Sequence, residues 1–260
     1  MKNIKEITKK ELNVMKVITF DIDGVIIPTG TDLRENIDGT ELYMKSKQLS
    51  AKFLNNLKKL KQYIKINFSS GRNIIYLKSL VNEIFDNQVL LQAENGNITW
   101  IKGKIIHPDY PESYFYKLRD IKEKIKKIMT IDKRIRGFEP KMFILTPHCD
   151  QIKEIPDLVK GMDEKNELYC LWTNEGYDIG SKSMTKGLGI LNLAKYLKIN
   201  PKQIMTTGNN YNDAEMLKIG KGVTVEPNRV KAEYFLEHEP NELGGELLAE
   251  FLLDYYNSKH

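Results

Sequence analysis

The sequence predicts an α/β protein in which a doubly wound, Rossmann-like parallel sheet carries an inserted α+β cap domain. Short apolar segments alternate with amphipathic helical segments over residues 17–93. Hairpin-like segments interrupt this alternation from residue 97, and the alternation returns after residue 186. Alternation of strands and helices is typical of a parallel sheet covered by helices, and connections in such sheets are right-handed.

The first core segment begins with Val17-Ile18-Thr19-Phe20, a run typical of a buried strand. Residues 49–60 repeat apolar side chains at helical spacing, with Ser50 as a candidate N-cap. A second strand is expected at 63–68, a second helix at 73–85 and a third strand at 89–93. Five elements in this order predict the first half of a parallel sheet.

The pattern changes in the middle of the chain, where Gly103 separates two short β-like runs at 98–101 and 104–106. We place the cap domain at residues 97–180 and the core at 1–96 and 181–260, with glycine-containing junctions at both ends. Further elements are expected in the cap: strands at 142–145, 167–173 and 177–179, and helices at 114–129 and 151–161.

The returning core pattern predicts helices at 187–197, 216–219 and 247–256, and strands at 203–207 and 222–225. Residues 1–14 are polar and lysine-rich, so we expect a helical or frayed extension without a part in catalysis. The polar segment 26–40 is longer than most connections and is expected to be a functional loop that could cover the site.

Composition excludes several classes of protein. The 260 residues are 41% hydrophobic and 29% charged with a net charge of +5, and basic residues are dispersed, which argues against nucleic-acid binding. Two cysteines without ligand spacing argue against a disulfide framework. We expect no membrane span and no signal peptide, hence a cytoplasmic protein, monomeric or homodimeric, that acts on a small anionic molecule.

The chemistry is expected at Asp21 and Asp23, which follow the first strand and precede Gly24. In an extended segment these two carboxylates point the same way, and their repulsion is relieved by a cation or a shared proton. The alternative is a strand end that carries acids by chance, or an Asp-Gly turn formed for backbone reasons.

Other core strands end in residues suited to an anion. Ser70-Gly71-Arg72 follows the second strand, Gly208-Asn209 through Asp213 follows a later one, and Lys186 precedes a helix. Carboxyl ends of parallel strands share one edge, so these groups can converge into a phosphoryl-transfer site. Each also has a simpler interpretation: Ser70 as a helix cap, Lys186 as a surface residue, and 208–213 as a plain loop.

In this order, the segments resemble the haloacid dehalogenase (HAD) superfamily of phosphatases, in the subclass of Cof-like sugar phosphatases with a type C2B cap. Asp21-Ile22-Asp23-Gly24-Val25 is similar to its first motif, Ser70-Gly71-Arg72 to its second and Lys186-Gly187 to its third. Gly208-Asn209-Asn210-Tyr211-Asn212-Asp213 is similar to the fourth, and Glu94-Asn95-Gly96 to the core-to-cap junction. The resemblance covers the chain from about residue 15.

The resemblance implies a role for each matching residue. Asp21 is the nucleophile that becomes an aspartyl phosphate, and Asp23 is the general acid and base. Mg²⁺ is held by Asp21, the backbone carbonyl of Asp23 and a fourth-motif side chain, so the implied metal-site residues are Asp21, Asp23, Asn209 and Asp213. The implied substrate-binding residues are Ser70, Gly71, Arg72, Asn95, Lys186 and Asn212.

The expected function is a Mg²⁺-dependent phosphatase of a small phosphate ester, most plausibly a sugar phosphate. Asn209 stands where the family usually has Asp, which removes a negative charge from the metal site. A catalytically weakened sugar-phosphate-binding protein therefore stays open as an alternative, and so does a phosphomutase, because the cap also resembles that of phosphomannomutases. In the cap, Arg134, Arg136 and Lys141 either contact the substrate or lie on a solvated loop, and His107 and His148 suggest no role.

Overall fold

The computed structural model describes residues 1–258 of the chain, which divide into two compact units. Unit 1 comprises residues 1–29, 48–107 and 185–260, and unit 2 comprises 30–47 and 108–184. The α/β core with an additional α+β unit that the sequence predicts is confirmed. The division differs from the expected cap range 97–180 because residues 98–106 belong to unit 1 and residues 30–47 to unit 2.

Unit 1 is built on a nine-stranded sheet in the order β1-β15-β14-β13-β2-β5-β6-β7-β8, and the first seven strands are parallel. Strand β7 pairs antiparallel with β6 and β8 with β7. The strands are β1 (Lys2–Asn3), β2 (Val17–Phe20), β5 (Lys65–Ser69), β6 (Val89–Ala93), β7 (Ile98–Ile101), β8 (Lys104–Ile106), β13 (Ile204–Gly208), β14 (Lys221–Thr224) and β15 (Tyr234–Phe235).

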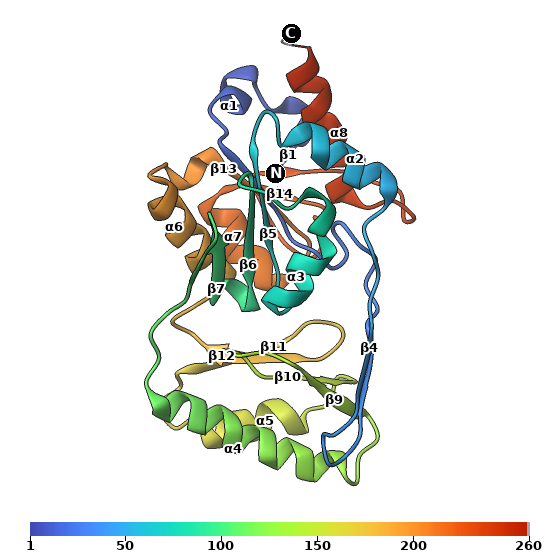
Figure 1. The fold of residues 1–260 in the computed structure, drawn as a ribbon, viewed down its shortest axis with the longest axis vertical. Coiled ribbons are helices and arrows are strands. Elements are labelled where there is room, and N and C mark those ends of the chain that lie inside the picture. The colour runs from blue at the N-terminus through green and yellow to red at the C-terminus, as the bar shows by residue number, and fades with distance from the viewer. Residues whose placement is uncertain (259–260) are drawn as a thin grey trace. The chain divides into compact units, whose positions relative to one another are not determined.

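Helices cover both faces of this sheet (Figure 1). Side chains alternate along a strand, so Val17 and Phe20 of β2 point to opposite faces. Val17 packs in one cluster with residues of α6 (Lys186–Leu197) and α7 (Ala214–Ile219). Phe20 instead meets Phe53 of α2 (Ala51–Leu60) edge to face, with ring centroids 5.6 Å apart, and α2 packs against α8 (Gly244–Asn257). Two apolar layers therefore fix β2 at the centre of unit 1.

Side-chain caps define where the helices near the strand ends begin. Ser50 caps α2 as predicted, because its hydroxyl accepts from Phe53 N–H at 3.0 Å. Asn73 caps α3 (Ile74–Leu80) and Thr185 caps α6 in the same way. The helix expected over 73–85 is shorter, since α3 ends at Leu80 and a 3₁₀ turn, η2 (Asn82–Ile84), follows.

The N-terminal segment is more ordered than the sequence suggested. Strand β1 adds to the sheet beside β15, and a 3₁₀ turn, η1 (Ile4–Glu6), and a short helix, α1 (Lys9–Asn13), follow it. The hairpin about Gly103 is confirmed, with Gly103 at φ +76°. The position of this hairpin was not predicted. Its residues were expected in the cap, whereas β7 pairs with β6 and extends the core sheet.

Unit 2 has antiparallel strand pairs with two helices. Its elements are β3 (Asp32–Glu35), β4 (Leu42–Lys45), α4 (Glu112–Met129), β9 (Ile135–Glu139), β10 (Thr146–Cys149), α5 (Glu154–Met162), β11 (Leu168–Trp172) and β12 (Tyr177–Ser181). Strand β9 pairs with β10, and β11 pairs with β12. Isolated bridges connect Leu145, just before β10, to Ile179 of β12, and His148 of β10 to Gly176, just before β12. Apolar side chains from all four strands and both helices form one core cluster.

Two expectations for unit 2 were wrong. The strand expected at 142–145 lies four residues later, at β10, and β9 was missed because Arg136 and Gly137 interrupt its apolar pattern. The expected loop 26–40 contains β3, which forms a hairpin with β4. Phe138 N–H of β9 donates to the Glu35 carboxylate at 2.8 Å, so this hairpin is fastened to the sheet of unit 2.

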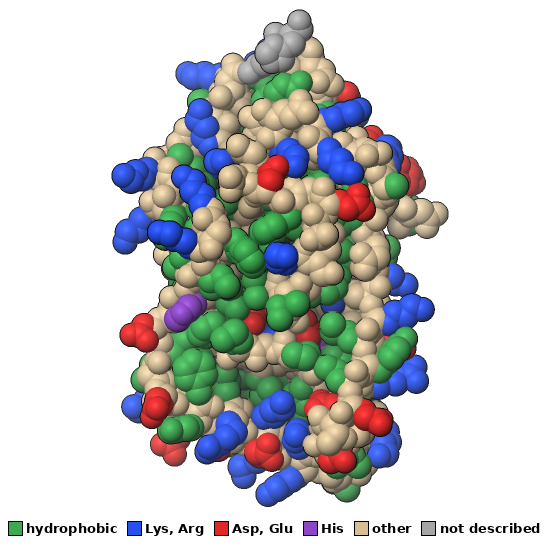
Figure 2. Space-filling model, viewed as in Figure 1, with side chains coloured by type: hydrophobic (Ala, Val, Ile, Leu, Met, Phe, Trp, Pro, Cys, Tyr) green, Lys and Arg blue, Asp and Glu red, His purple; other side chains and the backbone are tan. Residues whose placement is uncertain are grey.

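The surface gives no concentrated basic patch on the face drawn in Figure 2, where Lys and Arg side chains are scattered among acidic ones. None of the helices within residues 1–258 is long and apolar enough to cross a membrane.

Candidate functional site

The sheet topology places one strand end in a favourable position for a ligand. From β2 the chain proceeds to β5 and β6 on one side, whereas β13 and β14 lie on the other side. In open α/β sheets, ligands bind at the carboxyl ends of the strands where the order reverses. Asp21 follows β2 at this point, and its backbone N–H donates to the carbonyl of Thr207 in β13 at 3.0 Å.

A buried cation lies beside Asp21. The Nζ of Lys186, at the start of α6, is 2.7 Å from Oδ1 of Asp21 and 2.7 Å from Oδ1 of Asp213. The side chains of Lys186, Asp21 and Asp213 are 1%, 8% and 0% exposed. The alternative interpretation of Lys186 as a surface residue is therefore wrong, and three motifs that are distant in sequence meet around one ammonium group.

Burial and neighbouring charges shift the pKa values of Asp21 and Lys186. Burial, followed by the negative charge of Asp213, raises the pKa of Asp21 to about 7, although Lys186 acts in the opposite direction. Burial also disfavours the charged form of Lys186, but the Asp21 and Asp213 carboxylates outweigh it and raise the pKa of Lys186. The lysine is thus held as a cation between two carboxylates.

Asp213 is fixed by the chain itself as well as by Lys186. Its Oδ2 accepts from the backbone N–H groups of Asn209 and Asn210 at 3.0 and 3.1 Å. Asn210 in turn caps the short 3₁₀ turn η5 (Tyr211–Asp213). Both oxygens of Asp213 are therefore engaged by donors of the chain, one of them Lys186, and its role as a metal ligand stays a prediction.

Asp23 is engaged by the second motif. The guanidinium of Arg72 makes a bidentate pair with the Asp23 carboxylate, at 2.8 Å from Nε to Oδ2 and 2.5 Å from Nη2 to Oδ1. Arg72 also lies over the ring of Tyr76, 4.7 Å from its centroid. Two motifs that were predicted to converge are therefore in direct contact.

The remaining predicted residues lie in loops connected to these groups. Ser70 is buried, its hydroxyl accepts from Arg72 N–H at 3.2 Å, and its carbonyl accepts from Asn95 N–H at 3.0 Å. Asn95 has a left-handed backbone at φ +57°, which is uncommon outside glycine and concentrates at functional sites. Gly71 continues the loop between Ser70 and Arg72.

Asn95 belongs to a turn that packs against the helix of Lys186. Gly96, at φ +93°, lies so close to the Thr185 carbonyl that an added Cβ would stand 2.9 Å from it. The turn η3 (Glu94–Gly96) therefore joins the second-motif loop to the start of α6.

The divalent-cation site stays a prediction, and its candidate donors are one carboxylate, one backbone carbonyl and one amide. Within residues 1–258 no three His, Cys, Asp or Glu side chains are arranged to hold a metal ion. The Asn209 amide lies 3.1 Å from the Asp23 carbonyl oxygen, with its nitrogen toward that oxygen. Exchange of the amide nitrogen and oxygen leaves two oxygens at about the 3 Å spacing of adjacent ligands around Mg²⁺. Asp21, the Asp23 carbonyl and Asn209 fit a cation, whereas the side chains of Asp23 and Asp213 are otherwise engaged.

One residue in the predicted set has fewer contacts than the others. Asn212 has a buried side-chain oxygen without a hydrogen-bond partner among the described residues, so it stays available to a donor from a ligand. In unit 2, Arg134 pairs with Asp132 and Glu154, and Arg136 pairs with Asp150, on an exposed part of the surface. These two arginines do not form a basic group with Lys141, whose side chain is 2% exposed.

Comparison with known proteins shows what this chain is similar to. A model of the haloacid dehalogenase-like hydrolases matches residues 110–230. The chain is 24% identical over 214 residues to a phosphoglycolate phosphatase from Methanopyrus kandleri, which covers 80% of this chain and 82% of that protein.

Solved structures agree in fold. A trehalose-6-phosphate phosphatase related protein superposes with a TM-score of 0.70 at 12% identity, over 94% of this chain and 100% of the other. The C-terminal domain of trehalose-6-phosphate phosphatase from C. albicans superposes with a TM-score of 0.67 at 17% identity, over 96% and 94% of the two chains.

Proposed function

We propose that this chain is a phosphoric monoester hydrolase of the haloacid dehalogenase-like type and that it acts through an aspartyl phosphate on Asp21 with Mg²⁺ as cofactor. The proposed substrate is a small phosphorylated metabolite, and a sugar phosphate is the class that we expect. The observation that supports this proposal most directly is the contact of Lys186 with both Asp21 and Asp213 at the carboxyl ends of β2 and β13.

Asp21 has the position and charge for nucleophilic attack. Its carboxylate oxygen attacks phosphorus, an acyl phosphate bond forms and the bond from phosphorus to the leaving oxygen breaks. Lys186 places a positive charge beside that carboxylate, which offsets repulsion between the nucleophile and the phosphate dianion. Ser70, buried in the second-motif loop, contributes a hydroxyl for a phosphoryl oxygen.

Asp23 is proposed to move the protons. It protonates the leaving oxygen in the first step, and as a carboxylate it then takes a proton from the water that attacks the acyl phosphate and releases inorganic phosphate. To act as an acid Asp23 must carry a proton, and protonation weakens its pair with Arg72 because the two hydrogen bonds are then no longer made to a carboxylate charge.

Mg²⁺ would be held by Asp21, the carbonyl of Asp23 and the amide oxygen of Asn209. When bound, it supplies positive charge for the phosphoryl oxygens. The Gly24 position supports this assignment, because a Cβ there would lie 2.3 Å from Asn209 Nδ2, so only glycine leaves room for the asparagine beside the Asp23 carbonyl.

The test measures inorganic phosphate released from a panel of phosphorylated metabolites with Mg²⁺. Asp21→Asn keeps the shape of the side chain and removes the nucleophile, so we expect a loss of at least about 10³-fold in kcat. Asp254→Asn on exposed α8 is the matched control and should retain wild-type rates. Equal rates for wild type and Asp21→Asn would exclude Asp21 as the nucleophile.

A phosphomutase is the alternative that shares these residues. It would transfer the phosphoryl group from Asp21 to a second hydroxyl of the sugar, so a new phosphate ester forms and no inorganic phosphate is released. Stoichiometric release of inorganic phosphate from a sugar monophosphate, with the dephosphorylated sugar as product, argues against the mutase.

A further inference from the structure

The hairpin of β3 and β4 in unit 2 has one covered edge and one open edge. On the covered edge, Glu35 of β3 lies so close to β9 that a Cβ added to Gly137 would stand 3.0 Å from the Glu35 backbone nitrogen. Gly137 has φ +145°, a conformation that favours glycine. The open edge belongs to β4, whose Leu42 and Tyr43 are 43% and 52% exposed.

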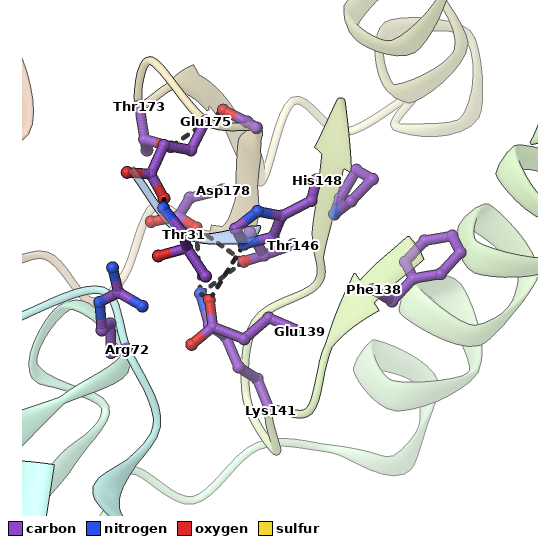
Figure 3. Close-up of polar contacts among 12 residues, drawn as sticks. Thr31, Arg72, Phe138, Glu139, Lys141, Thr146, His148, Thr173, Glu175 and Asp178 are labelled. Atoms are coloured by element: carbon purple, nitrogen blue, oxygen red, sulfur yellow. Dashed lines mark hydrogen bonds and ion pairs between the residues drawn. The ribbon is translucent and has the colours of Figure 1, made fainter. Parts of the chain in front are cut away.

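Two contacts fasten β3 and hold the hairpin in place. Just before β3 begins, the Glu175 carboxylate accepts from the backbone N–H groups of Gly30 and Thr31 at 2.6 and 3.2 Å (Figure 3). At the end of β3, the Glu35 carboxylate accepts from Phe138 N–H at 2.8 Å. The open edge is therefore held in position, so a strand that binds there has little conformational entropy of the hairpin to remove.

The hydrogen bonds of the hairpin determine which backbone groups of β4 face outward. Asn36 N–H donates to the Glu41 carbonyl at 3.1 Å. In an antiparallel pair, residues bonded to the partner strand alternate with residues whose N–H and C=O groups point away from it. Tyr43 is therefore bonded to β3 like Glu41, whereas Leu42 and Met44 present their N–H and C=O groups outward. These outward groups have no hydrogen-bond partner within residues 1–258.

The side chains along β4 are complementary to a second, antiparallel copy of the same strand. When Leu42 of one copy lies opposite Met44 of the other, their outward groups exchange hydrogen bonds in both directions. The same register brings Tyr43 opposite Tyr43, and Glu41 opposite Lys45 on both sides of the two-fold axis. Glu41 and Lys45 are exposed and have no ion-pair partner among the described residues.

The two end strands of the nine-stranded sheet lack this complementarity. Strand β8 and the turn before it carry Lys102 and Lys104, with no acidic residue between positions 98 and 106. Two copies of β8 would bring lysines together, and lysines on an edge strand discourage association. Strand β1, at the other end, has only two residues. Strand β4 instead combines both signs of charge with apolar and aromatic side chains.

We infer that the open edge of β4 binds a second copy of this chain, so that the two hairpins form one continuous antiparallel sheet across a two-fold axis. Two paired strands of this length bury less than the roughly 1,000 Å² typical of a stable complex, so the dimer is weak, with a dissociation constant on the order of 10 µM or above. The dimer uses residues of unit 2 alone and is independent of the proposed function.

Sedimentation equilibrium of the full chain, at concentrations from about 1 to 500 µM, measures the dissociation constant of this dimer. Glu41→Lys places lysines opposite one another in the dimer, and Lys45→Glu places acids opposite one another. Each variant alone should raise the dissociation constant by about 10-fold or more, because both symmetric pairs change from attraction to repulsion. Mixed in equal amounts, the two variants should form a heterodimer of wild-type affinity, since each new side chain then faces an opposite charge.

Three further variants make the test specific. Lys104→Glu makes the same change of charge on the exposed edge of β8 and should leave the dissociation constant unchanged. Lys47→Glu should also leave it unchanged, because Lys47 faces Glu41 only in the next allowed register, which uses residues beyond β4. Leu42→Pro removes an outward N–H that the hairpin itself does not use, so it should weaken the dimer while thermal unfolding stays close to that of wild type.

The contrary results are equally clear. A chain that stays monomeric over the whole concentration range would overturn the inference and leave the edge to a strand of another protein. Dimers unaffected by both charge variants, or single variants that do not recover affinity when mixed, would place the interface elsewhere and overturn it as well. A loss of affinity that Lys104→Glu shares would show a general effect of charge in place of pairing through β4.

Discussion

Lys186 and Asp213 form an ion pair with an Nζ to Oδ1 distance of 2.7 Å, and both side chains are almost completely buried. The pair links the third and fourth motifs, and the same ammonium group reaches Asp21 of the first motif at 2.7 Å. A buried ion pair costs desolvation, so its presence at the carboxyl ends of the central strands indicates that the position of the lysine is maintained for function.

The first prediction follows from this burial. Lys186→Met keeps the length of the side chain and leaves the carboxylates of Asp21 and Asp213 without a counter-charge. We expect the free energy of unfolding to fall by about 3–5 kcal/mol, as for other buried pairs that lose one partner. Urea unfolding at neutral pH measures it. The double variant with Asp213→Asn should recover part of the loss, and no recovery would contradict the pairing.

A second prediction concerns pH in protein freed of divalent cations. The pKa of Asp21 is raised from 3.8 to about 7, so the folded state binds a proton that the unfolded state has released. This contribution to stability is fully present below about pH 4 and is lost as the pH rises through about 7. Its size is at most about 4 kcal/mol, since one pKa unit corresponds to about 1.4 kcal/mol.

The check is a series of urea denaturations between pH 5 and pH 8.5 in the presence of a chelator. Wild type should lose stability over this range more steeply than Asp21→Asn, which cannot titrate at that position. Parallel stability curves for the two proteins would show that Asp21 is already ionised at pH 5.

The third prediction tests the bidentate contact of Arg72 with Asp23. Arg72→Lys keeps the positive charge but loses the planar fork that fixes both carboxylate oxygens. We expect kcat to fall about 10- to 100-fold through loss of positioned general acid–base catalysis, with little change in thermal stability. Arg119→Lys, at an exposed pair with Asp120, is the matched control. Unchanged kcat in Arg72→Lys would remove Arg72 from the positioning of Asp23.

Much of the core could be predicted because short stretches of sequence, such as apolar runs and helix caps, determine its strands and helices. The run Val17 to Phe20 is buried on both faces, and Ser50 caps the helix that the spacing predicts. The convergence of Asp21 with Lys186 also followed, since parallel strands bring their carboxyl ends to one edge. The hydrogen-bond partners within the site could not be predicted from the sequence. Either Lys186 or a metal could neutralise Asp213, and only tertiary packing brings Lys186 to it.

A buried polar group in unit 2, formed by Glu139, Lys141, Thr146, His148 and Asp178, was missed for a related reason. Glu139 and Asp178 are isolated acids in strands with interrupted patterns, and His148 beside Pro147 has the local context of a loop. Their proximity comes from strand pairing between β9 and β10 and from a bridge between Leu145 and Ile179. One usable signal was present: Asp178 stands between the apolar residues Tyr177 and Ile179, so it had to face away from the core.

The last prediction separates an enzyme with weak metal affinity from a protein that only binds its ligand. Asn209→Asp replaces the amide beside the Asp23 carbonyl by a carboxylate. Without metal, the new charge lies near Asp21 and loses the hydrogen bond to the carbonyl, so stability should fall by about 1–3 kcal/mol. With Mg²⁺ the same charge becomes a stronger ligand, and we expect the dissociation constant for Mg²⁺ to fall about 10-fold, or about 1.4 kcal/mol.

Thermal unfolding over a range of Mg²⁺ concentrations measures both effects. A ligand that binds only the folded state stabilises it by RT ln(1 + L/Kd), where L is the free ligand concentration. Asn55→Asp on the exposed side of α2 is the control for added charge, and its response to Mg²⁺ should equal that of wild type. Identical Mg²⁺ responses for Asn209→Asp and wild type would remove Asn209 from the metal site. Phosphate release that is measurable only in Asn209→Asp would identify the natural chain as a binding protein.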